Sequence, residues 1–431
     1  MELISEVLTA VSLLEKFNYE AYLVGGAVRD YIINKNNIKN KKTINKNGNE
    51  SYLKIKKIFD YDITTNAKPN EIKSVFKEYK TVDTGIKHGT VTVIINDIPL
   101  EITTYRFDGI YINNRKPKNV VFAEILKEDI VRRDFTINAL AYNPNIGLVD
   151  YCGGEKDINQ KLIRCVGNAD IRFKEDALRI LRALRFASVL KFNIENNTKA
   201  AIYKNKNLLK NISAERIFAE FKKLICGKTA AEVLKEYLEV FEVFIPKIIC
   251  LNNDFDFCAL NNLPENFILR FSFVFKEISL KYNINTVENI LNNLKADNYT
   301  KENVLGIINN YNIELSCEKP KIKYYLNKVG VETFKNINYL KQAEIYNKNE
   351  TELYKKILLL TDNIIKNKEC IFIKDLAVNG NDILPIIKDR KNISLILKEC
   401  LKAVTEEKIK NDKTEILSFI SLNFNKYLNL Q

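Results

Sequence analysis

Residues 21–33 have the sequence AYLVGGAVRDYII. The apolar residues 21–24 predict a buried strand, Gly25-Gly26 predicts a tight turn, and the following residues favour the start of a helix. Glycines in such a turn let backbone N–H groups approach a phosphate, and Arg29 adds positive charge beside them. Neither G-x-G-x-x-G nor G-K-[ST] is present, which excludes the dinucleotide fingerprint and the P-loop. The stretch predicts an anion-binding turn in a mixed α/β fold; a purely structural turn is the alternative.

An acidic motif, Asp60-Tyr61-Asp62, lies in the strand-like segment 59–64. Strand alternation places both carboxylates on one face, where their repulsion favours a cation between them. Because hard oxygen ligands suit Mg²⁺, we expect Asp60 and Asp62 to hold this ion while substrate phosphates occupy its remaining positions. Glu101 is a candidate third carboxylate on a neighbouring strand. The alternative is an ordinary solvated strand face.

The composition limits the class of protein. A chain of 431 residues with 46% hydrophobic and 10% aromatic residues predicts several folded units. Its formal charge of +13 fits a polyanion such as RNA, DNA or acidic lipid. The single histidine, His88, excludes a histidine-based zinc site, and eight cysteines without C-x-x-C spacing predict reduced core thiols. Glu2 and Glu6 argue against a secretory signal, and no apolar run reaches the ~18 residues of a membrane span, so we expect a cytoplasmic protein.

The arginines are unevenly distributed. Lysine outnumbers arginine 54 to 13, yet 11 of the 13 arginines lie within residues 1–216. Lysine supplies charge equally well, so retained arginine indicates a need for the guanidinium fork, which binds phosphate or a base edge through two donors. We therefore expect the chemistry in the first half of the chain.

The pattern changes after Gly153-Gly154, from mixed α/β to helices that continue to the end. Residues 34–57, rich in Asn and Lys, predict an exposed insertion. The helices predicted before Gly153 cover 3–17 and 69–79, and the strands cover 21–24, 59–64, 90–95 and 100–105.

A further helix is predicted around EDALRILRALRFA, residues 175–187. Its apolar, buried stripe is Ala177, Ile180, Leu181, Leu184 and Ser188. Its charged side is Arg172, Asp176, Arg179, Arg182 and Arg185. A solvated ladder of ion pairs is the structural alternative for this charged side.

Eight motifs, taken in order, resemble the class II tRNA nucleotidyltransferases, the family of CCA-adding enzymes. They are GGAVRD (25–30), DYDITT (60–65), TGIKHGTVTV (84–93), TTYRFDGIYINNRKP (103–117), RRDFTINAL (132–140), EDALRILRALRFA (175–187), SAERI (213–217) and KDLAVNGNDI (374–383). The resemblance covers almost the whole chain. The insertion between Asp30 and Asp60 departs from the family, which has a short connection there.

The resemblance implies an α+β multidomain fold. A nucleotidyltransferase-type mixed α/β head with a small β-sheet precedes an all-helical neck, body and tail. The expected parts are a catalytic head over 1–150, a nucleotide-selecting neck over 151–215, a body over 216–310 and a tRNA-binding tail over 311–431.

The resemblance also assigns roles to residues. Asp60 and Asp62 are the catalytic and metal-binding residues, and Asp176 and Arg179 recognise the base. Cytosine and adenine both present an amine donor beside a ring-nitrogen acceptor, so an aspartate next to an arginine accepts C and A and opposes U and G. The remaining expected nucleotide contacts are Gly26, Arg29, Arg133, Arg182 and Arg185.

The implied activity is template-independent addition of C, C and A to the 3′ end of tRNA. CTP and ATP are the donors, Mg²⁺ is the cofactor, and a second ion is expected to neutralise the departing pyrophosphate. Residues 109–115 resemble the family's flexible loop, linked to the switch from C to A, although an ordinary hairpin is the alternative. His88 is expected to be a turn residue or phosphate contact rather than a base.

Two other functions stay open at this point. A poly(A) polymerase or an A-only enzyme could share the scaffold, and a noncatalytic RNA-binding protein could retain the head. The second is disfavoured because both Asp60 and Asp62 are present. The lysines of residues 216–431 could together track the acceptor arm of a tRNA, but the sequence does not single any of them out.

Overall fold

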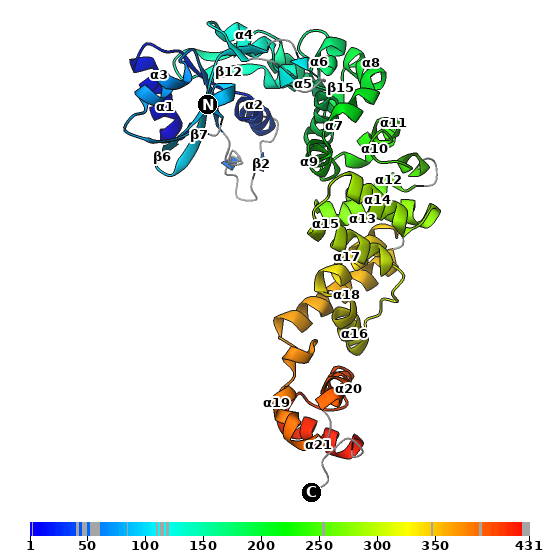
Figure 1. The fold of residues 1–431 in the computed structure, drawn as a ribbon. Helices are drawn as coiled ribbons and strands as arrows, with labels where there is room; N and C mark the ends of the chain where they lie inside the picture. Colours follow the sequence, from blue (N-terminus) through cyan, green and yellow to red (C-terminus); the bar gives the residue numbers. More distant parts are fainter. Residues whose placement is uncertain are drawn as a thin grey trace. The chain divides into compact units, whose positions relative to one another are not determined.

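The computed structural model describes the chain except for residues 2, 40–42, 45–49, 52–60, 84, 109–110, 113–115, 118–119, 252–254, 346–347, 388–389 and 425–431. It forms two compact units, Met1–Ile249 and Cys250–Gln431. The first unit contains the sheet and the second is helical, which confirms the predicted α+β class (Figure 1). The finer division at 150, 215 and 310 stays a prediction.

A seven-stranded sheet forms the first part of the chain, in the order β13-β12-β1-β4-β7-β6-β5. Only β4 and β7 run parallel among the described neighbours; the other pairs are antiparallel. The strands are β1 (Ala21–Val24), β4 (Asp62–Thr65), β5 (Lys80–Val82), β6 (Thr90–Ile95), β7 (Ile98–Thr104), β12 (Leu140–Asn143) and β13 (Gly147–Asp150). The predicted bounds of β1 and β6 are confirmed, whereas β7 begins and ends earlier than predicted.

One face of the sheet packs against α1 (Ser5–Lys16) and α3 (Pro69–Val75), which lie beside the strands in Figure 1. The helix α1 forms because its apolar residues recur at spacings of three and four, and it buries Val7, Val11 and Leu14. The prediction of a helix to about residue 79 was wrong at its end: α3 stops at Val75. The segment after it turns and then pairs with β6 as the edge strand β5.

The opposite face of the sheet is divided between a small core and a polar region. Tyr22 and Val24 of β1 pack with Ile130 of α4 (Leu126–Val131) in a core that also includes Tyr105. Beside this core, β4 and β7 carry the predicted polar residues, because strand alternation directs every second side chain to this face.

Several predictions fall on segments that the structure describes only in part. The helix α2 (Gly26–Lys39) extends into the predicted insertion 34–57, and β2 (Thr43–Ile44) pairs with β3 (Glu50–Ser51). The exposure of the rest of this insertion lies outside the described residues. In the predicted loop 109–115, only β9 (Tyr111–Ile112) is described, paired with β10 (Lys116–Pro117). The strands β8 (Arg106–Asp108) and β11 (Val120–Phe122) pair at the base of this loop.

Helices follow the sheet, as predicted. Those of the first unit are α5 (Gly154–Gln160), α6 (Ala169–Glu175), α7 (Leu178–Leu190), α8 (Asn196–Asn205), α9 (Ala214–Ile225), α10 (Ala230–Glu236) and α11 (Leu238–Phe241). Two short strands, β14 (Leu162–Ile163) and β15 (Asn193–Ile194), pair in parallel between them. All eight cysteines are free thiols, as expected.

The second unit consists of helices. They are α12 (Phe257–Asn262), α13 (Phe267–Lys281), α14 (Ile284–Asn293), α15 (Asn298–Asn309), α16 (Lys319–Val329), α17 (Val331–Ala343), α18 (Lys348–Lys366), α19 (Gly380–Ile383), α20 (Ile393–Thr405) and α21 (Lys413–Asn423). Within the described part of the chain, none of the helices has the length and apolar character needed to span a bilayer.

Candidate active site

The predicted glycine turn and the acidic strand meet at one end of the sheet. Val24, the last residue of β1, pairs with Asp62, the first residue of β4, and Gly25 follows at once with φ +73°. A Cβ atom at Gly25 would lie 3.7 Å from Asp62 Oδ2 and 3.5 Å from Arg133 NH1. Glycine is therefore favoured twice, because it adopts this left-handed conformation and leaves the carboxylate and the guanidinium close to the backbone. The structure thus brings Asp62, Gly25 and Arg133 together.

The carboxylates at this strand end suit a hard cation. Asp62 and Glu101 are register partners on the parallel strands β4 and β7, so their side chains project from the same face. Two carboxylates from adjacent strands are a donor set that fits Mg²⁺. Asp60 lies outside the described residues. Among the residues that are described, no three acidic, cysteine or histidine side chains form a cluster able to hold a metal.

A buried carboxylate holds the arginines next to this turn. Asp129 of α4 is fully buried and accepts hydrogen bonds from Arg132 Nε and NH2 at 3.0 and 2.7 Å. Its other oxygen accepts from Arg133 NH2 at 3.1 Å and from Thr64 Oγ1 at 3.2 Å. Burial would raise the pKa of Asp129, but the two guanidinium groups hold it below its usual value. The carboxylate therefore stays ionised and fixes Arg133 beside Gly25.

A second buried carboxylate connects the sheet to α7. Asp134 Oδ2 accepts from Arg182 Nε at 2.7 Å and NH2 at 2.6 Å, while Oδ1 accepts from Asn138 Nδ2 at 3.1 Å. Asn138 Oδ1 in turn accepts from Arg29 NH1 at 2.7 Å. Burial opposes the charge, but Arg182 and the hydrogen bonds lower the pKa of Asp134 to about 2. Two predicted nucleotide contacts, Arg29 and Arg182, are thus connected through side chains that sequence analysis gave no role.

Three arginines surround one aromatic ring. The guanidinium carbons of Arg29, Arg182 and Arg185 lie 5.1, 5.4 and 4.2 Å from the centre of the Phe186 ring. Arg185 Nε also lies 2.8 Å from the Glu220 carboxylate of α9. Stacking on the ring and pairing with acids keep three like charges in one place, despite their repulsion. This cluster of Arg29, Arg182 and Arg185 is the strongest concentration of predicted nucleotide contacts.

The predicted helix over residues 172–188 is interrupted. The helix α6 ends at Glu175, Asp176 is extended with φ −134° and ψ 105°, and α7 begins at Leu178. Asp176 Oδ1 accepts from the Leu178 backbone N–H at 3.0 Å, and a short polar side chain that bonds its own backbone competes with helix continuation. The prediction that Arg172, Asp176 and Arg179 share one continuous helix face was therefore wrong. The buried stripe, by contrast, is confirmed: Ala177, Ile180, Leu181, Leu184 and Ser188 are fully buried.

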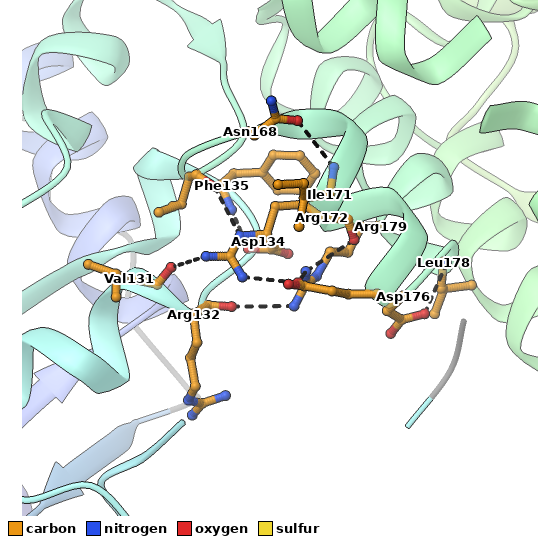
Figure 2. Close-up of polar contacts among 12 residues, drawn as sticks. Val131, Arg132, Asp134, Phe135, Asn168, Ile171, Arg172, Asp176, Leu178 and Arg179 are labelled. Atoms are coloured by element: carbon orange, nitrogen blue, oxygen red, sulfur yellow. Dashed lines mark hydrogen bonds and ion pairs between the residues drawn. The ribbon is translucent and has the colours of Figure 1, made fainter. Parts of the chain in front are cut away.

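The two predicted base-recognising residues have different partners. Asp176 Oδ2 forms an ion pair with Arg216 NH2 of α9 at 3.1 Å. Arg179, which is 7% exposed, donates from NH1 to Glu175 Oε2 at 2.6 Å and from NH2 to the Arg132 carbonyl at 3.3 Å. Figure 2 shows Arg179 and Arg172 converging on one carboxylate while Asp176 points elsewhere. The charged side is an inter-element network, rather than a solvated ladder.

Sequence analysis missed the residues that hold the predicted ones. These supporting residues are Asp129, Asp134, Asn138, Glu175, Phe186, Arg216 and Glu220. Most stand inside motifs already quoted, such as RRDFTINAL, so proximity to a predicted contact was the available signal. His88 lies at the end of a 3₁₀ turn, and its carbonyl accepts from Arg106 NH1, which agrees with its expected turn position.

Family models match three segments of the chain. Residues 21–164 match the poly(A) polymerase head domain, and residues 191–249 match the model for the RNA- and SrmB-binding site of polymerase A. Residues 274–420 match domain 2 of the tRNA nucleotidyltransferases. The first of these covers the sheet, Gly25, Asp62 and Arg133.

Curated relatives and solved structures cover almost the full length. The chain is 32% identical to the CCA-adding enzyme of Staphylococcus haemolyticus over 98% of both chains, and 35% identical to that of Ligilactobacillus salivarius over 95% of this chain and 94% of the relative. The crystal structure of the Bacillus stearothermophilus CCA-adding enzyme in complex with CTP superposes with a TM-score of 0.74, at 26% identity and with 98% and 97% coverage. A tRNA nucleotidyltransferase complexed with a primer tRNA and an incoming ATP analogue shares the fold, with a TM-score of 0.57 at 24% identity, over 83% of this chain and 99% of that one. By its sequence identity over nearly the whole length, the chain belongs to the class II CCA-adding enzymes, which are tRNA nucleotidyltransferases.

Proposed function

We propose that this protein adds C, C and A in turn to the 3′ end of tRNA, using CTP and ATP and releasing pyrophosphate. One observation carries the proposal: the arginine cluster on Phe186 is connected through Asn138 and Asp134, and the glycine turn beside Asp62 begins the helix that carries Arg29. Anion-binding groups and a carboxylate thus occur together, as a reaction at a nucleoside triphosphate requires. The printed complexes of relatives with CTP and with primer tRNA support the same substrates.

The triphosphate would be held by the glycine turn and the arginine cluster. The first turn of α2 begins at Gly26 and contains no acidic residue, so its backbone N–H groups favour an anion. Arg29 extends from the same turn, and Arg182 and Arg185 lie around the same ring. Because Asp134 and Glu220 pair with these side chains, the guanidinium groups are already oriented before substrate arrives, which lowers the cost of binding.

The metal is proposed to be Mg²⁺ bound by Asp60 and Asp62, with Glu101 on the neighbouring strand. The position of Asp62 supports this, because its carboxylate lies close to the glycine turn where phosphates would bind. When bound, the ion would lower the pKa of the RNA 3′ hydroxyl and favour its attack on the α-phosphate. Arg133, held by Asp129 beside Asp62, would add positive charge at the same place.

The base would be recognised by Asp176 and Arg179. An ionised aspartate only accepts hydrogen bonds and an arginine only donates them, so together they match the amine and ring nitrogen that C and A share. For U or G the carbonyl would face the carboxylate, at a cost of roughly 1 to 3 kcal/mol for each opposed contact. The burial of Arg179 supports this role, because water competes less with a base edge at a buried donor.

The proposal is tested by sequencing the 3′ ends formed on a tRNA that lacks its terminal nucleotides. The full chain is incubated with CTP, ATP and Mg²⁺ together, and with each nucleotide alone. We expect the defined end CCA with both nucleotides and a stop after two residues with CTP alone. A single A on a CC-ending tRNA only, or a long homopolymer, would replace the proposal with an A-adding enzyme or a poly(A) polymerase. Binding of tRNA without incorporation would indicate a noncatalytic protein.

A further inference from the structure

Arg216 stands apart from the arginines that pair with buried acids. It lies in the first turn of α9, and its NH2 group forms an ion pair with Asp176 Oδ2 at 3.1 Å. The other oxygen of Asp176 accepts from the Leu178 N–H at 3.0 Å. Both oxygens of this carboxylate are therefore held, one by the backbone of α7 and one by a side chain from α9. Rotation of the carboxylate about its own bonds would break at least one of these contacts.

The helix α9 is rigidly attached to α7. Ser188 Oγ of α7 donates to the Leu224 carbonyl at 2.7 Å, and a Cβ atom at Gly227 would lie only 2.0 Å from Ser188 Oγ. Ile217 and Phe221 of α9 are buried in this contact region. The close approach fixes the register of the two helices, and with it the distance from Arg216 to Asp176.

The second terminal nitrogen of Arg216 is unusual. NH1 is buried, and among the described residues no atom accepts a hydrogen bond from it. A buried donor without an acceptor costs stability, and native proteins retain such groups where a ligand, water or ion completes the site. This donor therefore lies beside Asp176 in a place that the protein alone leaves incomplete.

We infer that Arg216 is a positioning residue for base choice: it holds the Asp176 carboxylate in the one orientation that accepts an amine. The inference rests on the proposed base recognition by Asp176 and Arg179. Without Arg216 the carboxylate keeps its contact to Leu178 but turns more freely, so it meets the cytosine amine less well. It also opposes the uracil carbonyl less strongly, because the like-charged oxygen can move away.

The experiment compares CTP with UTP on a trimmed tRNA, using the full chain. The ratio of kcat/KM for the two nucleotides is measured for the parent, Arg216→Gln, Arg216→Lys and Asp176→Ala. Arg164→Gln is the matched control, because Arg164 also pairs with acids of the first unit, Asp157 and Glu195, but does not contact Asp176.

We expect Arg216→Gln to lower the CTP to UTP ratio about tenfold, through a higher KM for CTP with kcat little changed. Tenfold corresponds to about 1.4 kcal/mol. Arg216→Lys should retain most of the ratio, because an ammonium can still reach Oδ2, and Arg164→Gln should keep the parent ratio. The thermal midpoint of each variant is measured alongside. A purely structural role would lower kcat/KM for both nucleotides alike and leave the ratio unchanged.

The outcomes separate this inference from the proposed function. If Asp176→Ala relaxes base choice but Arg216→Gln keeps the parent ratio, the positioning role is wrong while base recognition stands. If Asp176→Ala also keeps the parent ratio, base recognition by Asp176 fails and this inference fails with it. Should Arg216→Gln not fold, Arg216→Lys decides: parent-like ratio and stability support the inference, and a parent-like ratio after the Asp176 contact is lost, seen in a crystal structure of that variant, contradicts it.

Discussion

The two units of this protein use different cations for the same task of neutralising buried acids. In Met1–Ile249, Arg132 binds Asp129 and Arg182 binds Asp134, each through two nitrogens. In Cys250–Gln431, lysines take this place: Lys323, only 7% exposed, pairs with Glu369 at 2.9 Å, and Lys276 pairs with Glu344. The chain contains far more lysine than arginine, so the arginines of the first unit are the exception that needs a reason.

Geometry supplies that reason. A guanidinium donates in fixed directions within a plane, so contacts to two or three acceptors fix its orientation, whereas an ammonium is a compact charge on a flexible stem. Arg172 shows this: it donates to the Val131 and Val166 carbonyls and to Glu175. The lysine pairs join helices, and that needs charge but little orientation. Arg270 of the second unit is consistent, because its fork spans two carbonyls, of Leu263 and Pro264.

The largest effect is expected at the strand end of the first unit. Asp62→Ala should reduce nucleotide incorporation roughly 10³-fold, about 4 kcal/mol of transition-state stabilisation, because a proposed metal ligand is lost. Binding of tRNA, measured by filter retention, should persist. The control is Asp83→Asn, which removes an exposed partner of Lys73 and should keep parent activity. Equal turnover in Asp62→Ala and Asp83→Asn would rule out the metal assignment.

The next effect concerns base choice. Asp176→Ala should lower the preference for CTP over UTP by about ten- to a hundredfold, since it removes an acceptor that matches C and opposes U. The measurement is competitive incorporation on trimmed tRNA with both nucleotides present. Glu242→Gln, which removes a carboxylate that accepts from exposed backbone N–H groups of residues 247 and 249, is the control with parent-like preference. A variant at Asp176 that still excludes UTP as strictly as the parent would contradict base recognition there.

Exchange of the two cations tests the comparison between the units itself. Arg182→Lys keeps the charge but loses the two-nitrogen contact to Asp134, so we expect the KM for CTP to rise about tenfold and the free energy of unfolding to fall by about 1 to 2 kcal/mol. The reciprocal variant, Lys335→Arg in the second unit, keeps its pair with Asp362 and should change stability by less than about 0.5 kcal/mol. Steady-state kinetics and urea unfolding measure both. Equal effects of the two exchanges would show that the guanidinium geometry is unimportant.

The smallest effect is the acid sensitivity of the Asp134 contact. The pKa of Asp134 is lowered from 3.8 to about 2 in the folded protein. A lowered pKa means that the ionised carboxylate contributes stability above about pH 4, and that this contribution is lost as the pH falls toward 2. The stability difference between the parent and Asp134→Asn should therefore narrow by about 1 kcal/mol between pH 6 and pH 3. Urea unfolding at both pH values measures it; a difference independent of pH would contradict the lowered pKa.

The sequence predicted local structure better than it predicted interruptions. The strands β1 and β6 were predicted residue for residue, because apolar alternation and the flanking turns leave little choice. The break at Asp176 was missed, since apolar spacing continues through 175–187 and the side-chain contact to Leu178 leaves no periodic signal. The hairpin of β12 and β13 was likewise missed.

Pairing between distant elements was beyond the sequence. The predicted residues Arg29 and Arg182 do meet around one ring, but nothing in their spacing indicates Asn138 and Asp134 between them. A motif shows which residue types are present, while the packing of α7, α9 and the sheet decides which acid holds which arginine. The supporting residues are therefore found only once these elements are assembled.

A crystal structure of the protein with CTP tests the central claim most directly. We predict that the cytosine amine lies within hydrogen-bond distance of the Asp176 carboxylate, that Arg179 donates to the ring nitrogen, and that the phosphates lie beside Gly25 and Arg29. A CTP molecule bound with its base away from Asp176 and Arg179, or with its phosphates away from the glycine turn, would contradict it.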